Sequence, residues 1–372
     1  MPLILIATML TLSALYVPQP LLPVLAAEFA VSRETAALLT TSVFIPLSLA
    51  PLLYGYLLES VPARRMLQVA MLLLGLTSLV ICLVDSFTLL LGLRLIQGLL
   101  IPALLTALMT YVAQSAGQGD VQRAMAWYIG ATIVGGFAGR ALSGIIASLF
   151  NWRVSFALLA VSLLLTWLGL LRLPVSGALQ LVKPKFGLLR DILADRRFLR
   201  LYLMVFSLFL VFAAVMNFLP FRLTELTPQA DELRIGLAYS GYLMGLLASL
   251  SAVRLQERFG GPDRVMVLAL LLYVLALLLL IVPVVPVLLA TLFLLCGAMF
   301  LTHATATGLV NRLAGRHKGM VNGLYVSFYY GGGAVGSSLP GYVYRGWGWT
   351  GFVASLLVFA LAALLLVCRR RH

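Results

Sequence analysis

Two arginines and one histidine lie inside long apolar runs of the sequence: Arg94, Arg140 and His303. A buried guanidinium keeps its charge and therefore needs polar ligands, anions or backbone carbonyls as partners. A buried imidazole differs, because histidine gains and loses a proton close to neutral pH. No Asp or Glu lies in the middle of any of these runs. The residue types thus indicate two chemistries, the binding of an anionic or polyhydroxylated solute by two arginines and the carriage of a proton by His303.

The apolar runs that hold these side chains make up most of the chain. Of 372 residues, 62% are hydrophobic and 10% are charged, whereas a soluble domain is roughly half apolar and a quarter charged. This composition excludes a water-soluble enzyme of this size. Since a helix needs about 20 apolar residues to cross a bilayer, the sequence predicts an all-α integral membrane protein with twelve transmembrane helices, over residues 3–27, 35–58, 66–84, 87–113, 121–148, 154–173, 199–221, 236–256, 265–282, 287–310, 320–344 and 350–368.

The longest polar interruption divides these spans into two sets of six. We expect a six-helix bundle over residues 1–172, a cytoplasmic linker over 173–198 and a second six-helix bundle over 199–372. An internal repeat supports this division, because a shift of 197 residues superposes the fifth span on the eleventh. Tyr128, Gly135, Gly136, Gly139, Leu142, Gly144 and Trp152 fall on Tyr325, Gly332, Gly333, Gly336, Leu339, Gly341 and Trp349. Such a parallel repeat is typical of the two halves of a transporter.

The basic residues predict the orientation in the membrane. Of the 26 Lys and Arg residues, nineteen fall in one set of alternate loops and five in the other, while Arg94 and Arg140 lie inside spans. Basic loops stay in the cytoplasm, so we expect both termini on the cytoplasmic side of the cell inner membrane. The net charge of +14 is explained by this topology, and no nucleic-acid partner is expected.

Several short motifs have the spacing found in one family. They are Leu15-Tyr16-Val17-Pro18-Gln19-Pro20, Arg94-x-x-Gln97-Gly98, Gly135-Gly136-x-x-Gly139-Arg140-x-x-x-Gly144, Asn151-Trp152-Arg153, His303 and Tyr329-Tyr330. Along essentially its whole length the sequence resembles the bacterial transporters of the major facilitator superfamily. Within that superfamily it is most similar to drug and sugar efflux proteins of the proton-antiporter type, especially arabinose-efflux inner-membrane transport proteins. The resemblance implies two pseudo-symmetric six-helix bundles and links Arg94 to proton coupling.

The superfamily's signature loop between spans two and three is altered in this sequence. Glu59 stands where the family has Asp, Pro62 where it has Gly and Ala63 where it has Arg, and Arg64 follows. A carboxylate here could meet the positive N-terminal end of span eleven. Glu59 and Arg64 are therefore the candidate conformational latch, with a solvated loop glutamate as the alternative.

The candidate site residues follow from these patterns, each beside a structural alternative. By helix rise Arg94 and Arg140 lie roughly 10–12 Å below the periplasmic surface, where they could instead extend toward the interface or brace helices through carbonyls. His303 could simply hydrogen-bond to a neighbouring helix. We expect the substrate and proton pathway to be formed by Arg94, Arg140, His303, Tyr16, Gln19, Gln97, Asn217, Tyr329 and Tyr330. We expect hinge or packing roles for Gly98, Gly135, Gly136, Gly139, Gly144, Gly332, Gly333 and Gly336.

The function expected from these features is secondary active transport. The protein would export a small solute, such as a sugar, metabolite or drug, by alternating access and in exchange for protons. An organic-anion uniporter or importer without proton coupling is an alternative, and an intramembrane enzyme or sensor is a remote one, because the sequence has no H-E-x-x-H or G-x-S-G motif. We expect a monomer in the lipid bilayer that binds a small-molecule substrate and protons, is not an enzyme, and uses no cofactor and no metal.

Overall fold

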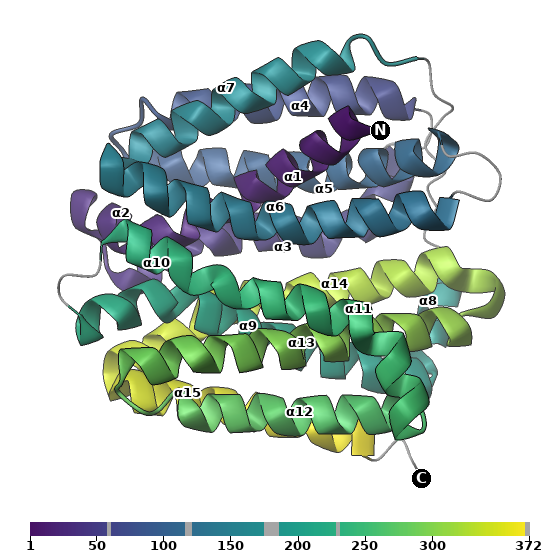
Figure 1. Cartoon of the computed structure of the whole chain (residues 1–372). Helices are drawn as coiled ribbons and strands as arrows, with labels where there is room; N and C mark the ends of the chain where they lie inside the picture. The colour runs from purple at the N-terminus through teal and green to yellow at the C-terminus, as the bar shows by residue number, and fades with distance from the viewer. Residues whose placement is uncertain (58–60, 116–120, 175–185, 228–230, 369–372) are drawn as a thin grey trace. The chain divides into compact units, whose positions relative to one another are not determined.

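The computed structural model describes residues 1–57, 61–115, 121–174, 186–227 and 231–368, and the regular elements among them are helices (Figure 1). Segments that cross a membrane form helices, because a helix satisfies its own backbone hydrogen bonds where no water is available. The helices form two compact units. The first unit contains α1 to α7 with most of α10, and the second contains α8, α9 and α11 to α15.

The first unit begins with a broken helix. Its elements are α1 (Pro2–Tyr16), η1 (Gln19–Leu21), α2 (Leu22–Glu28), α3 (Arg33–Leu57), α4 (Ala63–Ile81), α5 (Phe87–Ser115), α6 (Val121–Leu149) and α7 (Trp152–Leu170). The helix α1 packs along α6, α3 along α5, and α4 between α5 and α7 (Figure 1). The candidate pathway residues and packing glycines of this unit lie on α1, η1, α5 and α6, and Arg64 lies on α4.

The second unit repeats this arrangement of pairs. Its elements are α8 (Phe186–Ala194), α9 (Arg196–Leu226), η2 (Tyr239–Gly241), α11 (Tyr242–Phe259), α12 (Pro262–Leu279), α13 (Val285–Leu313), η3 (Gly315–His317), α14 (Lys318–Gly336) and α15 (Leu339–Cys368). The helix α10 (Glu232–Ala238), most of which belongs to the first unit, lies just before η2 in the chain. The helix α14 packs along α9, and α13 packs along α11 and α12. The pairs α1 with α6 and α9 with α14 occupy corresponding places in the repeat.

The predicted spans correspond to these helices, with two differences. Among the described residues, eleven helices or joined helix pairs are long and apolar enough to cross a membrane. The predicted split near Pro283 is confirmed, because α12 ends at Leu279 and α13 begins at Val285. The predicted span 320–344 is wrong at its end, because the chain turns at residues 337–338 and Pro340 opens α15. The helix α14 falls outside the eleven because asparagine, serine, tyrosine and glycine lower its hydropathy.

Two further places depart from the expected spans. The helix α15 is interrupted at Gly348, whose φ of 67° is a conformation that glycine adopts without strain. Part of the expected linker, residues 175–185, lies outside the described residues, and the rest contains the short amphipathic helix α8, which packs on α9.

Candidate functional site

Arg94 of α5 is completely buried, and all its recorded partners are neutral oxygens. Its Nε donates to the carbonyl of Leu39 (3.1 Å), its Nη1 to that of Ala14 (2.8 Å) and its Nη2 to that of Leu15 (2.8 Å). A fourth hydrogen bond runs from Nη1 to Oε1 of Gln97, one turn along α5 (2.7 Å). Arg94 therefore joins α1, α3 and α5 through backbone carbonyls, which are the contacts expected of a brace.

The carbonyls that Arg94 binds are available because α1 breaks next to them. The carbonyl of Ala14 would ordinarily accept from the N–H four residues later, but that residue is Pro18, which has no N–H. The last carbonyls of a helix need partners from outside it, and Arg94 supplies them. Gln97 extends the network to α4, because its Nε2 donates to Oγ of Ser78 (3.0 Å).

Arg140 of α6 lies in a second polar cluster on the other side of the break. It is 1% exposed, its Nε donates to Oε1 of Gln19 (2.7 Å) and its Nη1 donates to the carbonyl of Gly136 (2.6 Å). Its guanidinium carbon lies 3.6 Å from the centroid of the Tyr16 ring, a cation–π contact. The structure thus brings three predicted pathway residues together, Tyr16, Gln19 and Arg140.

His303 lies between α13 and α14 and is partly buried. Its Nδ1 is 3.1 Å from the hydroxyl oxygen of Tyr325, and its ring centroid is 4.7 Å from that of Tyr329. Its backbone carbonyl accepts from the hydroxyl of Thr307, one turn further along α13 (2.8 Å). The imidazole is therefore held by two tyrosines of α14, and only one of them, Tyr329, is among the predicted pathway residues.

Tyr329 belongs to an aromatic group that the second unit forms around His303. Its ring stacks on Phe209 of α9, with centroids 3.8 Å apart and planes at 13°, and it meets Tyr330 edge-on at 5.1 Å. Asn217, also on α9, instead donates to the carbonyl of Ser337 at the break after α14 (2.8 Å).

The predicted packing glycines lie where helices approach most closely, and the approaches repeat after 197 residues. A Cβ added at any of four glycines would overlap backbone atoms of the facing helix: Gly135 with Met9, Gly139 with Ser13, Gly332 with Phe206 and Gly336 with Leu210. Every position in the second pair of contacts is 197 residues after its counterpart in the first. The repeat in the sequence is therefore also a repeat in helix packing, between α1 and α6 and between α9 and α14.

The other predicted glycines have varied surroundings. Gly98 of α5 faces the backbone of Val43 on α3, where a Cβ would lie 2.8 Å from the Val43 Cα. Gly136 faces the Tyr16 ring at an ordinary van der Waals distance of 3.5 Å. Gly144 lies one turn beyond Arg140 on α6, and Gly333 is buried on α14.

The sequence matches the profile of the Major Facilitator Superfamily over residues 4–253 and 224–372, which together include nearly the whole chain. The chain belongs to the Major Facilitator Superfamily. It is accordingly a multi-pass membrane protein of a family of transporters. The similarity to that superfamily inferred from the motifs is confirmed at this level.

Two bacterial relatives align with nearly the whole of this chain. The inner membrane transport protein YnfM of Escherichia coli (strain K12) is 30% identical over 375 residues, covering 98% of this chain and 89% of YnfM. The MFS-type transporter YybF of Bacillus subtilis (strain 168) is 27% identical over 359 residues, covering 95% of this chain and 89% of YybF.

Solved structures of superfamily members share the fold at low identity. A point mutant of the nucleoside transporter NupG superposes with a TM-score of 0.81 at 16% identity, covering 99% of this chain and 98% of NupG. The human organic anion transporter MFSD10 superposes with a TM-score of 0.70 at 21% identity, covering 98% of each chain. At these identities the likeness establishes the fold alone.

The predicted superfamily latch is only partly visible. Glu59 lies outside the described residues. Arg64, at the start of α4, donates from Nη2 to the carbonyl of Leu171 at the end of α7 (2.9 Å). Arg64 therefore contacts the sixth span of its own unit.

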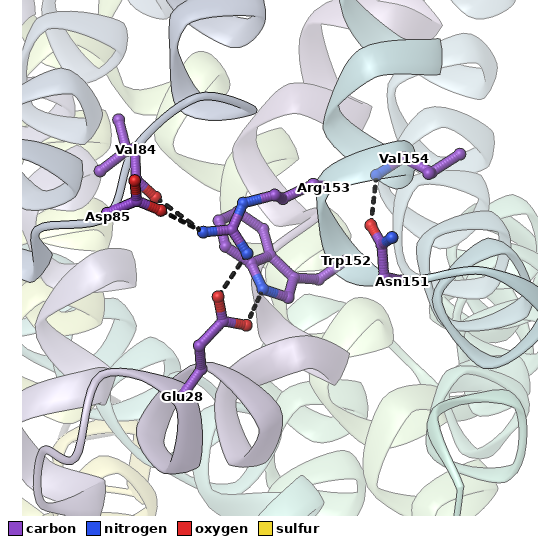
Figure 2. Close-up of polar contacts among 7 residues, drawn as sticks. All are labelled: Glu28, Val84, Asp85, Asn151, Trp152, Arg153 and Val154. Carbon is purple, nitrogen blue, oxygen red and sulfur yellow. Dashed lines mark hydrogen bonds and ion pairs between the residues drawn. The ribbon is translucent and has the colours of Figure 1, made fainter.

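A polar cluster at one end of the first unit involves Arg153, which follows Trp152 in the superfamily motif (Figure 2). Arg153 forms ion pairs with Glu28, at the end of α2, and with Asp85 (2.8 Å), and it donates to the carbonyl of Val84 (3.1 Å). The Trp152 indole donates to the other carboxylate oxygen of Glu28. One carboxylate thus connects the end of the broken first span to the start of α7.

The second unit has a related cluster at the corresponding place. Glu225, 197 residues after Glu28, accepts from the hydroxyl of Tyr344 (2.6 Å) and pairs with Arg222 (3.3 Å). Trp349, 197 residues after Trp152, donates its indole N–H to the carbonyl of Leu280 (2.7 Å). Both units therefore use a glutamate and a tryptophan at this end, but with different partners.

Sequence reasoning missed several polar residues that the structure places in the membrane-spanning units. Glu34 of α3 is 3% exposed, although it lies one residue before the predicted span 35–58. Tyr325 was noted only for the repeat, and Asn311 and Asn322, which bond to each other between α13 and α14 (2.7 Å), were not noted. A polar residue every third or fourth position on two neighbouring spans is the signal that could have found them.

No metal site can be assigned in the described part of the chain. The residues with coordinates there contain no group of three or more His, Cys, Asp or Glu side chains that could hold an ion.

Proposed function

We propose that this superfamily member exports a small solute, a sugar, metabolite or drug, from the cytoplasm across the inner membrane in exchange for protons. The two units act as the two halves of an alternating-access mechanism, with both termini in the cytoplasm. The similarity to an inner membrane transport protein of Escherichia coli supports the location, and the excess of basic residues in one set of loops supports the orientation.

The observation that carries the proposal is the setting of His303. It is a titratable side chain within a span, bonded through Nδ1 to Tyr325 and in ring contact with Tyr329. When His303 is neutral, the partly buried rings of Tyr329 and Tyr330 favour binding of an uncharged ring such as a sugar. Protonation adds a positive charge beside the Tyr329 ring and so changes the affinity for the solute, which couples the two fluxes.

The two arginines have different roles in this proposal. The charge of Arg94 is bound by three carbonyls and Gln97, so Arg94 and Gln97 hold the first unit in shape. Arg140, stacked on Tyr16 and bonded to Gln19, is the group that contributes affinity for a polyhydroxylated or anionic solute. This assignment narrows the cationic site to one arginine.

A second candidate is uniport or import of an organic anion without proton coupling. The observation that favours it is Arg140, a buried cation within a span of the first unit. It differs from the first candidate in one measurable respect, the response of solute flux to a pH gradient.

Everted membrane vesicles distinguish the two candidates. Vesicles energised by respiration are loaded with protons, and acridine orange reports the gradient while L-arabinose, ethidium or p-aminobenzoate is added. An antiporter releases protons when its solute is added, and His303→Ala should abolish that release. If a compound is transported at the same rate with and without a protonophore, proton exchange is wrong and the uniport candidate is favoured.

A further inference from the structure

A continuous set of polar side chains runs from His303 along the contact between α13 and α14. We call it the α13–α14 polar track, and its members are His303, Thr307, Asn311, Asn322 and Tyr325. The Tyr325 hydroxyl bonds to Nδ1 of His303 (3.1 Å), and Asn311 donates to the Thr307 carbonyl (3.0 Å). Asn322 donates to Oδ1 of Asn311 (2.7 Å). The members on α13 are four residues apart and therefore share one face of that helix.

The track leads from the middle of a span to water. His303 lies ten residues before Leu313, the end of α13, which is about 15 Å of helix. Beyond Asn311, the last turn of α13 carries Arg312, the connection carries His317, and α14 begins at Lys318; all three residues are exposed. Asn311 is only partly buried. The excess of basic residues in this set of loops predicts that the connection lies on the cytoplasmic side.

The first unit shows the same helix contact without the titratable group. There the hydroxyl of Thr110 donates to the Thr106 carbonyl (2.9 Å), and the hydroxyl of Tyr128 donates to the Leu105 carbonyl (3.0 Å). The positions 197 residues later are Thr307, His303 and Tyr325.

One asparagine of the track is also particular to the second unit. The residue that corresponds to Asn311 is Gln114, which also carries an amide, whereas the residue that corresponds to Asn322 is the apolar Met125. The threonine and tyrosine hydroxyls thus belong to the shared architecture, whereas His303 and Asn322 are additions. Packing of the two helices does not require these additions, because the first unit packs without them.

We propose that the α13–α14 polar track is the route by which protons pass between the cytoplasm and His303. The inference rests on the proposed proton exchange and names its cytoplasmic pathway. The amides of Asn311 and Asn322 carry no proton themselves, but they hydrogen-bond water in a span that is otherwise apolar. At the inner end, Tyr325 donates its hydroxyl proton to Nδ1 of His303 while its oxygen accepts a proton from a hydronium ion, which becomes water. The phenol is unchanged and the imidazole gains one positive charge; release reverses both transfers.

The groups that face His303 are compatible with this step. Its recorded ring and side-chain contacts are with Tyr325 and Tyr329 of α14. The neighbouring elements η2, α11 and α12 carry Tyr239, Tyr242 and Tyr273, whose recorded hydrogen bonds and ring contacts are with residues other than His303. The charged residues of α9, α11 and α12 all lie near the ends of those helices. Protonation of His303 therefore changes the charge in the interior of the span, away from these groups.

Deuterium exchange at the imidazole Cε1–H tests the route without a known substrate, because the probe is D2O. The full-length protein in nanodiscs is incubated in D2O, and peptides are analysed by mass spectrometry. In Asn311→Leu and in Asn322→Leu, exchange at His303 should slow by about tenfold or more, because an apolar side chain holds no water. Exchange at His317, which is exposed on the connection, serves as the internal control and should not change.

Two tyrosine variants separate proton transfer from water access. Tyr325→Phe should shift the pH midpoint of exchange at His303, whereas Tyr128→Phe, which removes the corresponding hydroxyl of the first unit, should leave it unchanged. Equal exchange at His303 in the wild type and both leucine variants would overturn the route, and so would equal shifts in the two tyrosine variants.

The same variants distinguish a failed route from a failed function. If Asn311→Leu slows exchange but everted vesicles release no protons with any compound, the water path exists and proton-coupled export is wrong. If protons are released normally by Asn311→Leu and Asn322→Leu, export stands and the track is wrong. Asn311→Ser, which keeps a polar group, should retain most of the exchange rate.

Discussion

Replacement of Arg94 by leucine tests whether this arginine braces the first unit. Arg94 supplies four hydrogen bonds, three of them to carbonyls near the end of α1 and inside α3. Leucine leaves these buried acceptors without a donor, and each such acceptor costs about 1–3 kcal/mol. Leucine also removes the desolvation cost of the buried charge, which offsets part of this loss. We therefore expect the free energy of unfolding to fall by about 3–5 kcal/mol, as when one partner of a buried ion pair is removed.

The expected loss converts into a measurable temperature. For a unit of this size, 1 kcal/mol shifts the melting temperature by about 2–4 °C, so Arg94→Leu should melt roughly 6–20 °C lower. Thermal unfolding in detergent, followed by tryptophan fluorescence, measures this shift. The control is Arg65→Leu, because Arg65 is exposed in the same unit.

A lysine variant separates charge from geometry. Lysine keeps the positive charge, but its single ammonium group cannot reach carbonyls on both α1 and α3. The planar guanidinium of Arg94 does so because it has donors on three nitrogens. Arg94→Lys should therefore melt between the wild type and Arg94→Leu. The reasoning is refuted if Arg94→Leu melts within about 1 °C of the wild type, or if the lysine variant restores full stability.

Three further predictions follow from contacts outside the pathway. Gly336→Leu should destabilise the second unit by about 1–3 kcal/mol or more, because its side chain would overlap the backbone of α9, and thermal unfolding measures this. Glu28→Gln should cost about 1 kcal/mol or less, since the ion pair with Arg153 is about one-third exposed on each side, and the cost should shrink in high salt. Asp195→Ala should lower the free energy of unfolding by about 1 kcal/mol, because the Asp195 carboxylate accepts a hydrogen bond from the Arg197 N–H and so caps the start of α9. The hydrogen bond from the Arg197 side chain lowers the pKa of Asp195. The stabilisation is therefore present above about pH 4 and is lost in acid, which thermal unfolding at a series of pH values measures.

Each of these variants has a control that preserves the surroundings. Gly346→Leu introduces the same side chain on α15 where a Cβ would meet no atom within 4 Å, so equal destabilisation would contradict the close-approach argument. Asp195→Asn keeps a cap without the charge and should lose the acid dependence. An effect of Glu28→Gln that grows with salt would exclude the ion pair as its cause.

Much of the fold could be predicted because the bilayer restricts the choices. An apolar run of the right length must be a helix, and Pro283 and Pro286 mark the turn between two of them. The repeat of 197 residues predicted which glycines pack closely, because a helix that approaches another within a few ångströms tolerates no side chain at the contact. The end of the eleventh span was predicted wrongly although the sequence marks it, since Gly336, Ser337, Ser338 and Pro340 form a helix-ending signal.

The partners of the candidate residues could not be read from the chain. Arg94 was recognised as a buried cation, but its bonds to Ala14 and Leu15 arise only when α5 lies against the broken end of α1. Likewise His303 was identified by its type, whereas Tyr325 became its partner through the rotation of α14 about its axis. A change of one residue in helix register would present a different side chain to His303.

The amino-acid sequence alone determined the membrane location, the helical class, the repeat and the short set of polar residues within the spans. Those properties depend on composition and on local spacing, which the chain carries wherever it folds. The tertiary structure decided which helix faces meet, and therefore that the charge of Arg94 is bound by carbonyls, that Arg140 stacks on Tyr16, and that His303 begins a polar track. Such pairings join residues that are tens to hundreds of positions apart, and only the packing of whole helices brings them within hydrogen-bonding distance.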